Sequence, residues 1–145
     1  MDRDQITLEQ IIQFMERQIP FNRLLGIRVA VLRDGFARME LPYRDDLVGD
    51  PFRPALHGGV MSALIDTCGG AAVWTRVESR DRVSTVDLRV DYLRPGPLED
   101  LACEATVVRA GNRVGVADMK LFAVSAPERV IASGKGVYNI VRHEE

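Results

Sequence analysis

The chain has 145 residues, of which 46% are hydrophobic and 28% charged, which is the size and composition of one domain with a sizeable core. Its 19 basic and 21 acidic residues give a formal net charge of -2 and are mixed along the sequence. This pattern argues against a nucleic-acid-binding arm, an acidic tail or a basic membrane-binding helix.

The first residues lack the pattern of a signal peptide, and no apolar run reaches the roughly 18 residues that a membrane span requires. We therefore expect a cytoplasmic protein whose partners are small molecules or further copies of itself. Cys68 and Cys103 are expected to be free buried thiols, because a domain of this size in a reducing compartment does not need a disulfide.

The chain opens with a predicted amphipathic helix. Thr7 and Gln10 have the spacing of a capping box, and Pro20 is expected to end the helix. Two strands are predicted next, over 26–32 and 36–41, joined by a tight turn at Asp34-Gly35. Residues 42–56 hold three prolines and show no periodicity, which predicts a loop.

Residues 58–77 form the longest predicted helix, and it is apolar nearly all round. A strand follows in which Val86, Leu88, Val90 and Tyr92 are expected on the buried face. Three more strands are predicted, and they are hairpin-connected: 98–109, 113–124 and 129–141.

This order of elements predicts an α+β domain, in which a curved antiparallel sheet packs against one central helix. Glycines and alanines at 69–72 would let another element approach that helix closely. No repeat or linker divides the chain. We expect a single domain over 1–145, with an N-terminal helix in 1–20 and the core in 21–141.

Two features of the central helix can support chemistry. His57-Gly58-Gly59 places backbone N–H groups without intrahelical partners at its start, which suits an oxyanion, although the glycines could equally serve a tight turn. Asp66 is a carboxylate on an otherwise apolar helix. It is either paired with an arginine such as Arg89 or Arg94, or it is a partly desolvated base or nucleophile.

The segments HGGVMSALID (57–66) and TVDLRVDYLRP (85–95) closely resemble those of hotdog-fold acyl-CoA thioesterases of the phenylacetate-pathway type. The resemblance implies a hotdog fold, in which a six-stranded antiparallel sheet wraps the long helix, and a homodimer or homotetramer. It implies hydrolysis of an acyl-CoA thioester to a carboxylate and coenzyme A. No cofactor and no metal are implied, since coenzyme A is part of the substrate.

The same resemblance assigns roles to residues. The Gly58 N–H would polarise the thioester carbonyl, and His57 would shape the site where the helix begins. Asp66 would be the catalytic carboxylate, and the Thr85 hydroxyl would lie near the attacking water. Substrate binding would involve five residues: Gly59, Arg94, Gly111, Asn112 and Arg113. One departure is that Pro51, beside Asp50, stands where relatives commonly have an asparagine six residues before the histidine.

The spacing of Gly58 and Asp66 predicts how a site would be assembled. Eight residues span about 12 Å of helix, whereas one carbonyl must meet both groups within about 3 Å. We therefore expect Gly58 of one subunit to face Asp66 and Thr85 of another. By strict alternation, Thr85 falls on the polar face of its strand with Asp87 and Arg89.

The sequence lacks the motifs of serine hydrolases and of zinc sites. There is no serine-hydrolase elbow, and two histidines with two scattered cysteines give no zinc spacing. Two alternatives remain open: a hotdog enoyl-CoA hydratase or dehydratase, and a non-catalytic acyl-CoA-binding protein.

A basic cluster of Arg76, Arg80 and Arg82 could meet coenzyme A phosphates. Candidates for the lining of the acyl pocket are Trp74, Phe52 and Met61.

Overall fold

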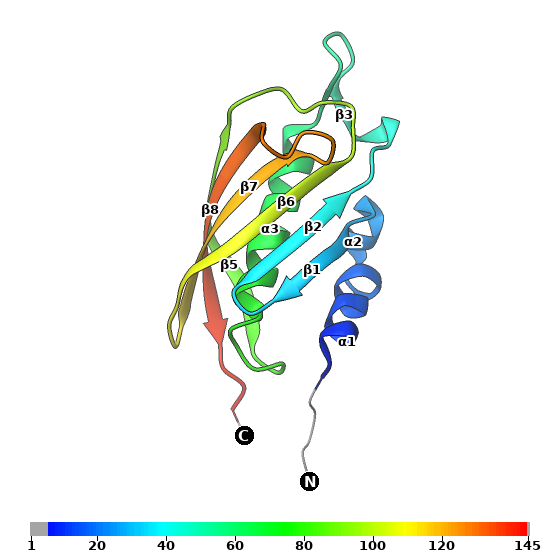
Figure 1. Ribbon diagram of the computed structural model, residues 1–145. Coiled ribbons are helices and arrows are strands. Elements are labelled where there is room, and N and C mark those ends of the chain that lie inside the picture. Colours follow the sequence, from blue (N-terminus) through cyan, green and yellow to red (C-terminus); the bar gives the residue numbers. More distant parts are fainter. Residues whose placement is uncertain (1–5, 145) are drawn as a thin grey trace.

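The computed structural model describes residues 6–144 and has a six-stranded antiparallel sheet that curves around one long helix (Figure 1). The strand order is β1-β2-β6-β7-β8-β5. The strands are β1 (Arg28–Arg33), β2 (Phe36–Leu41), β5 (Arg82–Tyr92), β6 (Leu101–Ala110), β7 (Val114–Ala123) and β8 (Val130–Val141). The expected α+β arrangement is confirmed.

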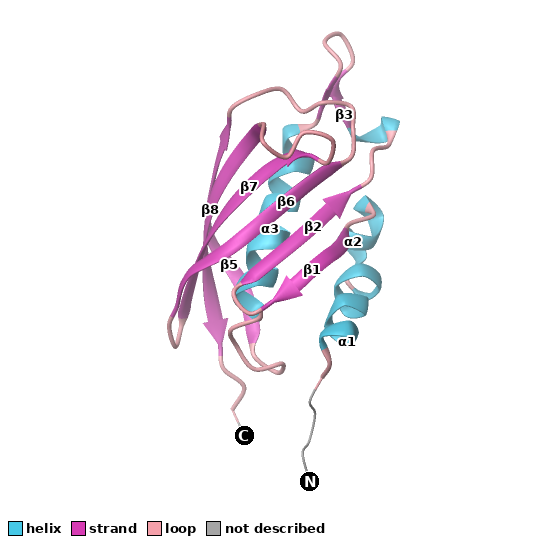
Figure 2. Cartoon of the chain, in the orientation of Figure 1, coloured by secondary structure: helices cyan, strands magenta, loops and turns pink. Residues whose placement is uncertain are grey.

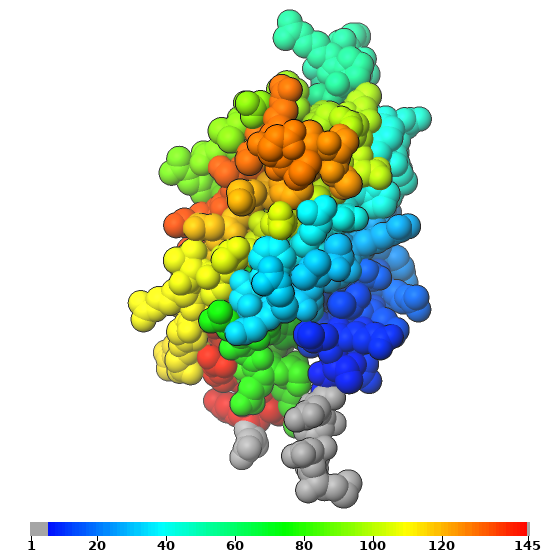
Figure 3. Space-filling view, viewed as in Figure 1, coloured from blue at the N-terminus to red at the C-terminus, as the bar shows by residue number. Residues whose placement is uncertain are grey.

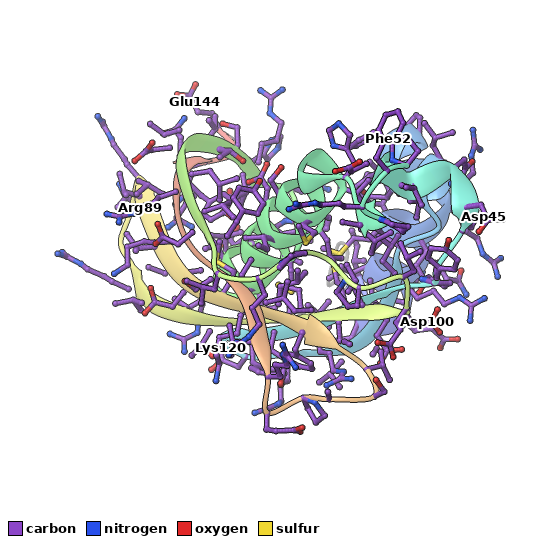
Figure 4. All side chains as sticks on the ribbon, turned by 90° about the horizontal axis from the view of Figure 1, so that it is seen from above. Asp45, Phe52, Arg89, Asp100, Lys120 and Glu144 are labelled. Carbon is purple, nitrogen blue, oxygen red and sulfur yellow. The ribbon has the colours of Figure 1, made fainter. Side chains whose placement is uncertain are left out.

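The central helix α3 (Gly58–Trp74) lies in the concave side of the sheet, as the view from above shows (Figure 4). Small residues permit this close approach. Gly69 lies against the Tyr138 hydroxyl, and a Cβ on Gly115 would come within 2.5 Å of the Val73 side chain. The expectation of close packing at 69–72 is therefore confirmed at Gly69.

The hairpins follow from local chemistry. Gly35 has φ 72° in the turn between β1 and β2, a conformation that a side chain disfavours. The predicted strand over 36–41 matches β2, and the three predicted C-terminal strands match β6, β7 and β8 to within a few residues. These long hairpin-connected strands form the middle of the sheet (Figure 2).

The N-terminal segment differs from the prediction. Helix α1 (Leu8–Gln13) begins at the expected capping box and continues as one π-helical turn, η1 (Phe14–Gln18). The first helical segment ends before Pro20, as expected, and Pro20 is then the first residue of a second helix that was not predicted, α2 (Pro20–Leu25). Proline suits the first helical position, since it needs no N–H partner there. Residues 1–5 of the predicted segment lie outside the described residues.

The predicted loop over 42–56 contains two short elements. A 3-10 turn, η2 (Asp45–Leu47), precedes a small hairpin of β3 (Val48–Asp50) and β4 (Ala55–Leu56), which projects from the body of the molecule (Figure 3). Asp50 Oδ1 accepts hydrogen bonds from the N–H groups of Phe52 and Arg53, at 2.9 and 3.1 Å, and so forms the turn. Strands of two and three residues are too short to show the alternation of apolar and polar side chains by which a strand is predicted.

Strand β5 departs from strict alternation. Thr85 pairs with Tyr138 and Asp87 pairs with Val137, so Val86 is an extra residue in a β-bulge. The expected burial of Val86 and Tyr92 was wrong, because these residues are 65% and 50% exposed. Leu88 and Val90 pack against the core as predicted.

Both cysteines are free and buried, as expected. The Cys68 thiol donates to the carbonyl oxygen of Cys103 at 3.3 Å, and burial raises the pKa of the Cys103 thiol well above its usual value. Within residues 6–144, no helix has the length and apolar character needed to cross a membrane.

Candidate active site

The centre of the candidate site is a contact between α3 and β5. The Thr85 hydroxyl donates to Asp66 Oδ1 at 2.7 Å. Asp66 is half-buried, whereas Thr85 is exposed to solvent in the single chain. The bulge at Val86 explains this contact, because one extra residue puts Thr85 on the same side of the strand as Leu88.

A salt bridge does not account for Asp66. Arg89 is paired with Asp91 at 3.3 Å, and Arg94 donates to the carbonyl oxygen of Val130 at 2.9 Å. Within the described part of the chain, no cation lies within ion-pair distance of Asp66. Its carboxylate is therefore available for chemistry.

Tyr138 is a neighbour of Asp66 that the sequence analysis missed. Its ring is buried against α3, and its hydroxyl donates to the backbone carbonyl of Asp66 at 2.9 Å. Burial, followed by the nearby Asp66 carboxylate, raises the pKa of the Tyr138 hydroxyl well above its usual value, so this group stays protonated. Strand alternation was the available signal, since Tyr138 shares its face with buried Ile140.

The start of α3 presents one free amide. His57 is the N-cap, and its Nδ1 accepts the N–H of Gly59 at 2.8 Å. The Tyr92 hydroxyl donates to the Gly58 carbonyl at 3.0 Å. Among residues 6–144, none accepts a hydrogen bond from the Gly58 N–H, which leaves this group and not that of Gly59 to meet an oxyanion.

One chain does not bring Gly58 and Asp66 together. Both residues belong to the continuous helix α3, eight residues apart, which corresponds to about 12 Å along the axis.

A cavity of about 810 Å³ opens beside Asp66 and Thr85, within the size range of small-molecule sites. It lies between α3, the N-terminal helical segment and strands β5 and β8. Of the three expected lining residues, Trp74 contributes to the wall. Phe52 instead lies in the β3–β4 hairpin and is 94% exposed (Figure 4), and Met61 is buried in the core.

The residues expected to bind coenzyme A are spread over the chain. Arg94 follows the end of β5 that pairs with Ala132, whereas the turn at 111–113 lies beside the opposite end, where Arg82 pairs with Val141. Ten residue steps separate these ends, about 33 Å along a strand.

The carbonyl groups of Gly111 and Asn112 both accept hydrogen bonds from the Arg142 guanidinium, at 3.2 and 2.9 Å. In the basic cluster, Arg76 is paired with Asp34 at 2.6 Å, while Arg80 and Arg82 reach the cavity.

Asp81, a residue of the cavity lining, is bonded to the segment that follows β8. It is 5% exposed and accepts hydrogen bonds from the N–H of His143, the N–H of Glu78 and the Arg142 guanidinium, at 2.9, 3.0 and 2.9 Å. These bonds, led by that from His143, outweigh burial and lower the pKa of Asp81. Its position in a short charged loop gave no sequence signal for this role.

No group of histidine, cysteine and acidic side chains that could hold a metal ion occurs in the described part of the chain.

Comparisons with known proteins show the family and the fold. A family model of the thioesterase superfamily matches residues 54–128, more than half of the chain. The chain belongs to the thioesterase superfamily. The matched residues include α3 with Asp66 and the whole of β5 with Thr85.

Two curated proteins are similar to the chain over most of their length. A protein of Halobacterium salinarum, described as a candidate esterase, is 36% identical, and the match covers 83% of each chain. The medium/long-chain acyl-CoA thioesterase YigI of Escherichia coli is 33% identical, over 93% of this chain and 97% of its own.

Solved thioesterase-superfamily structures share the fold. A thioesterase family protein from Silicibacter pomeroyi has a TM-score of 0.85 at 27% identity, covering 93% of this chain and 98% of its own. A related protein from Shewanella oneidensis has a TM-score of 0.81 at 29% identity, covering 91% and 94%. The expected hotdog fold is confirmed, and family and relatives together support a thioester hydrolase.

Proposed function

We propose that the protein hydrolyses acyl-CoA thioesters to a free carboxylate and coenzyme A, with Asp66 as the catalytic carboxylate. The observation that carries this proposal is the position of Asp66, a half-buried carboxylate with no cationic partner among the described residues, at the wall of a largely apolar cavity. The name of YigI, an acyl-CoA thioesterase, supports the choice of substrate.

In the proposed reaction the acyl chain enters the cavity and the thioester carbonyl lies next to Asp66 and Thr85. Asp66 takes a proton from a water molecule that attacks the carbonyl, or it attacks directly and forms an anhydride that water then cleaves. In both routes the carbon–sulfur bond breaks, and the thiolate of coenzyme A leaves and is protonated. Thr85 orients the carboxylate and the water.

We also propose that the oxyanion donor comes from a second copy of the chain. The Gly58 N–H has no acceptor among the described residues, yet it is about 12 Å from Asp66 on the same helix, too far for one carbonyl to contact both. Thr85 is exposed in the single chain, so a second copy can cover it. The oligomer is then a dimer or a tetramer in which each site uses Gly58 of one subunit and Asp66 of another.

The first test is release of free thiol from a panel of acyl-CoAs. Asp66→Asn keeps the shape of the side chain and removes its charge, and we expect kcat to fall by about 10²- to 10⁴-fold. Asp118→Asn is the matched control, because Asp118 is an exposed carboxylate paired with Lys135 away from the cavity. Tight acyl-CoA binding without any thiol release by the wild type would instead identify a non-catalytic acyl-CoA-binding protein.

Subunit mixing tests the shared site. Gly58→Pro removes the free amide and is tolerated at the first helical position, where a Cβ would lie 3.5 Å from the Tyr92 ring. Each variant alone is expected to be inactive. A reassociated equimolar mixture of Asp66→Asn and Gly58→Pro should recover about a quarter of the wild-type activity, since half of the dimers carry one intact site out of two. No recovery in a mixture shown to contain heterodimers would place each site within one subunit.

A further inference from the structure

The cavity beside Asp66 follows one face of α3. Asp66, Gly70 and Trp74 are spaced by four residues, so they lie one above the other along the helix, and all three line the cavity. The cavity therefore begins at the candidate carboxylate and runs toward the C-terminal end of α3. Gly70, in the middle, contributes no side chain to it.

The N-terminal segment roofs this passage. Ile11, Phe14 and Ile19 line the cavity from the side opposite α3. At the far end the rings of Phe14 and Trp74 meet edge to face, with their centroids 6.0 Å apart. The wall between Asp66 and the two aromatic rings is thus largely apolar, and polar residues line the cavity at both ends, with Asp66 and Thr85 at one end and residues 79–82 at the other.

One hydrogen bond holds the N-terminal segment together, and a second attaches it to the sheet. The buried Asn22 side chain donates to the Met15 carbonyl at 3.1 Å, and the Glu16 carboxylate accepts the N–H of Val29, the second residue of β1, at 2.8 Å. The π-helical turn that carries Phe14 is therefore fixed in place over the cavity.

The length of the passage can be compared with that of an acyl chain. Eight residues from Asp66 to Trp74 correspond to about 12 Å of helix axis. An extended chain of tetrahedral carbons advances about 1.25 Å per bond, so about ten bonds fit between the carboxylate and the aromatic pair.

We propose that Gly70 and the Phe14–Trp74 pair determine acyl-chain length, and that the cavity selects saturated acyl groups of about ten to twelve carbons. Gly70 keeps the passage open about 6 Å beyond Asp66, and the two rings meet at the far end of its α3 wall. This inference rests on the proposed function, since it assumes that the acyl chain of the substrate enters the cavity.

The test is kcat/KM for saturated acyl-CoAs from about four to about sixteen carbons. For the wild type, kcat/KM should rise about fourfold with each added methylene until the passage is full, and then level off or fall. Gly70→Leu places a branched side chain midway along the passage, at a residue where leucine has the better helix propensity. We expect its optimum to move to about six carbons, and the ratio of kcat/KM for a ten-carbon chain to that for a four-carbon chain to fall at least tenfold.

Phe14→Ala is the second variant, and it opens the far end without filling the passage. Its optimum should move to chains at least two carbons longer. Phe21→Ala is the matched control, because Phe21 is 54% exposed against 47% for Phe14, and it does not line the cavity. Its profile should match that of the wild type.

The outcomes separate the two proposals. If the wild type hydrolyses acyl-CoAs and both variants keep its chain-length profile, or lose activity equally at every length, the length-selecting role is wrong and the proposed function stands. If the wild type hydrolyses no acyl-CoA of any length, the proposed function itself fails.

Discussion

Two adjacent glycines in α3 should respond in opposite ways to the same added methyl group. In a helix, alanine is more favourable than glycine by about 1 kcal/mol, so propensity alone predicts that both substitutions stabilise. The surroundings differ, however. A Cβ on Gly69 would overlap the Tyr138 hydroxyl and lie 2.9 Å from the Met119 sulfur, whereas a Cβ on Gly70 would lie 3.4 Å from the Tyr138 ring, an ordinary contact.

The cost at Gly69 can be worked from these contacts. Met119 ends in a flexible thioether that can yield, but the Tyr138 ring is held by its neighbours and its hydroxyl is bonded to the Asp66 carbonyl. Overpacking costs about 1–3 kcal/mol, and loss of that hydrogen bond about 1 kcal/mol more. After the gain in helix propensity, Gly69→Ala should lower the free energy of unfolding by about 1–3 kcal/mol. Gly70→Ala should leave it unchanged or raise it by up to about 1 kcal/mol.

The assay is urea unfolding of wild type and both variants at one protein concentration, because an oligomer's stability depends on concentration. The comparison is internal, since the two positions share a helix and receive the same substitution. If both variants were stabilised alike, the close approach of α3 to Tyr138 would not be the reason for glycine at 69, and the reasoning from the packing would be refuted.

Two further predictions concern Thr85 and Asp81. Thr85→Val removes the hydroxyl that donates to Asp66 Oδ1, so kcat should fall about tenfold or more with little change in KM. Thr85→Ser keeps the hydroxyl and should keep most of the activity. An unchanged kcat in the valine variant would leave Thr85 without a role in the reaction. The folded-state pKa of Asp81 is lowered, so its carboxylate stabilises the fold above its ordinary pKa of about 4, and this stability is lost as the pH falls through the lowered value. Thermal unfolding followed from about pH 7 to about pH 3 should therefore show a steeper acid loss in the wild type than in Asp81→Asn, which should already melt lower at neutral pH; parallel curves would contradict this.

The elements that leave a local pattern of apolar or turn-forming residues in the sequence were predictable. The apolar helix, the turn at Asp34-Gly35 and the hairpin-connected strands after residue 98 each leave a local pattern, and the structure has them within a few residues. The hairpin at 48–56 was not predictable, since its two strands are too short for a period and its turn depends on one carboxylate, that of Asp50.

The candidate site was predictable in its residues but not in its surroundings. Asp66 and Thr85 were expected together only from the resemblance, because strict alternation put Thr85 on the wrong face of its strand. Tyr138 lies 72 residues from Asp66 along the chain, and nothing local to either residue indicates their contact. The roof of the cavity was missed for the same reason, since Pro20 reads as the end of a helix and gives no sign of where that helix packs.

The extra residue in β5 also affects how related sequences should be compared. Thr85 and Leu88 share a face although they are three positions apart, because Val86 is not matched by a residue of β8. In a relative without that insertion, the residue equivalent to Thr85 would stand two positions before the residue equivalent to Leu88, and not three. An ungapped alignment that matches Leu88 would therefore misplace the equivalent of Thr85 by one position. The counterpart of Thr85 is therefore better located by its distance from the helix carboxylate than by counting along the strand.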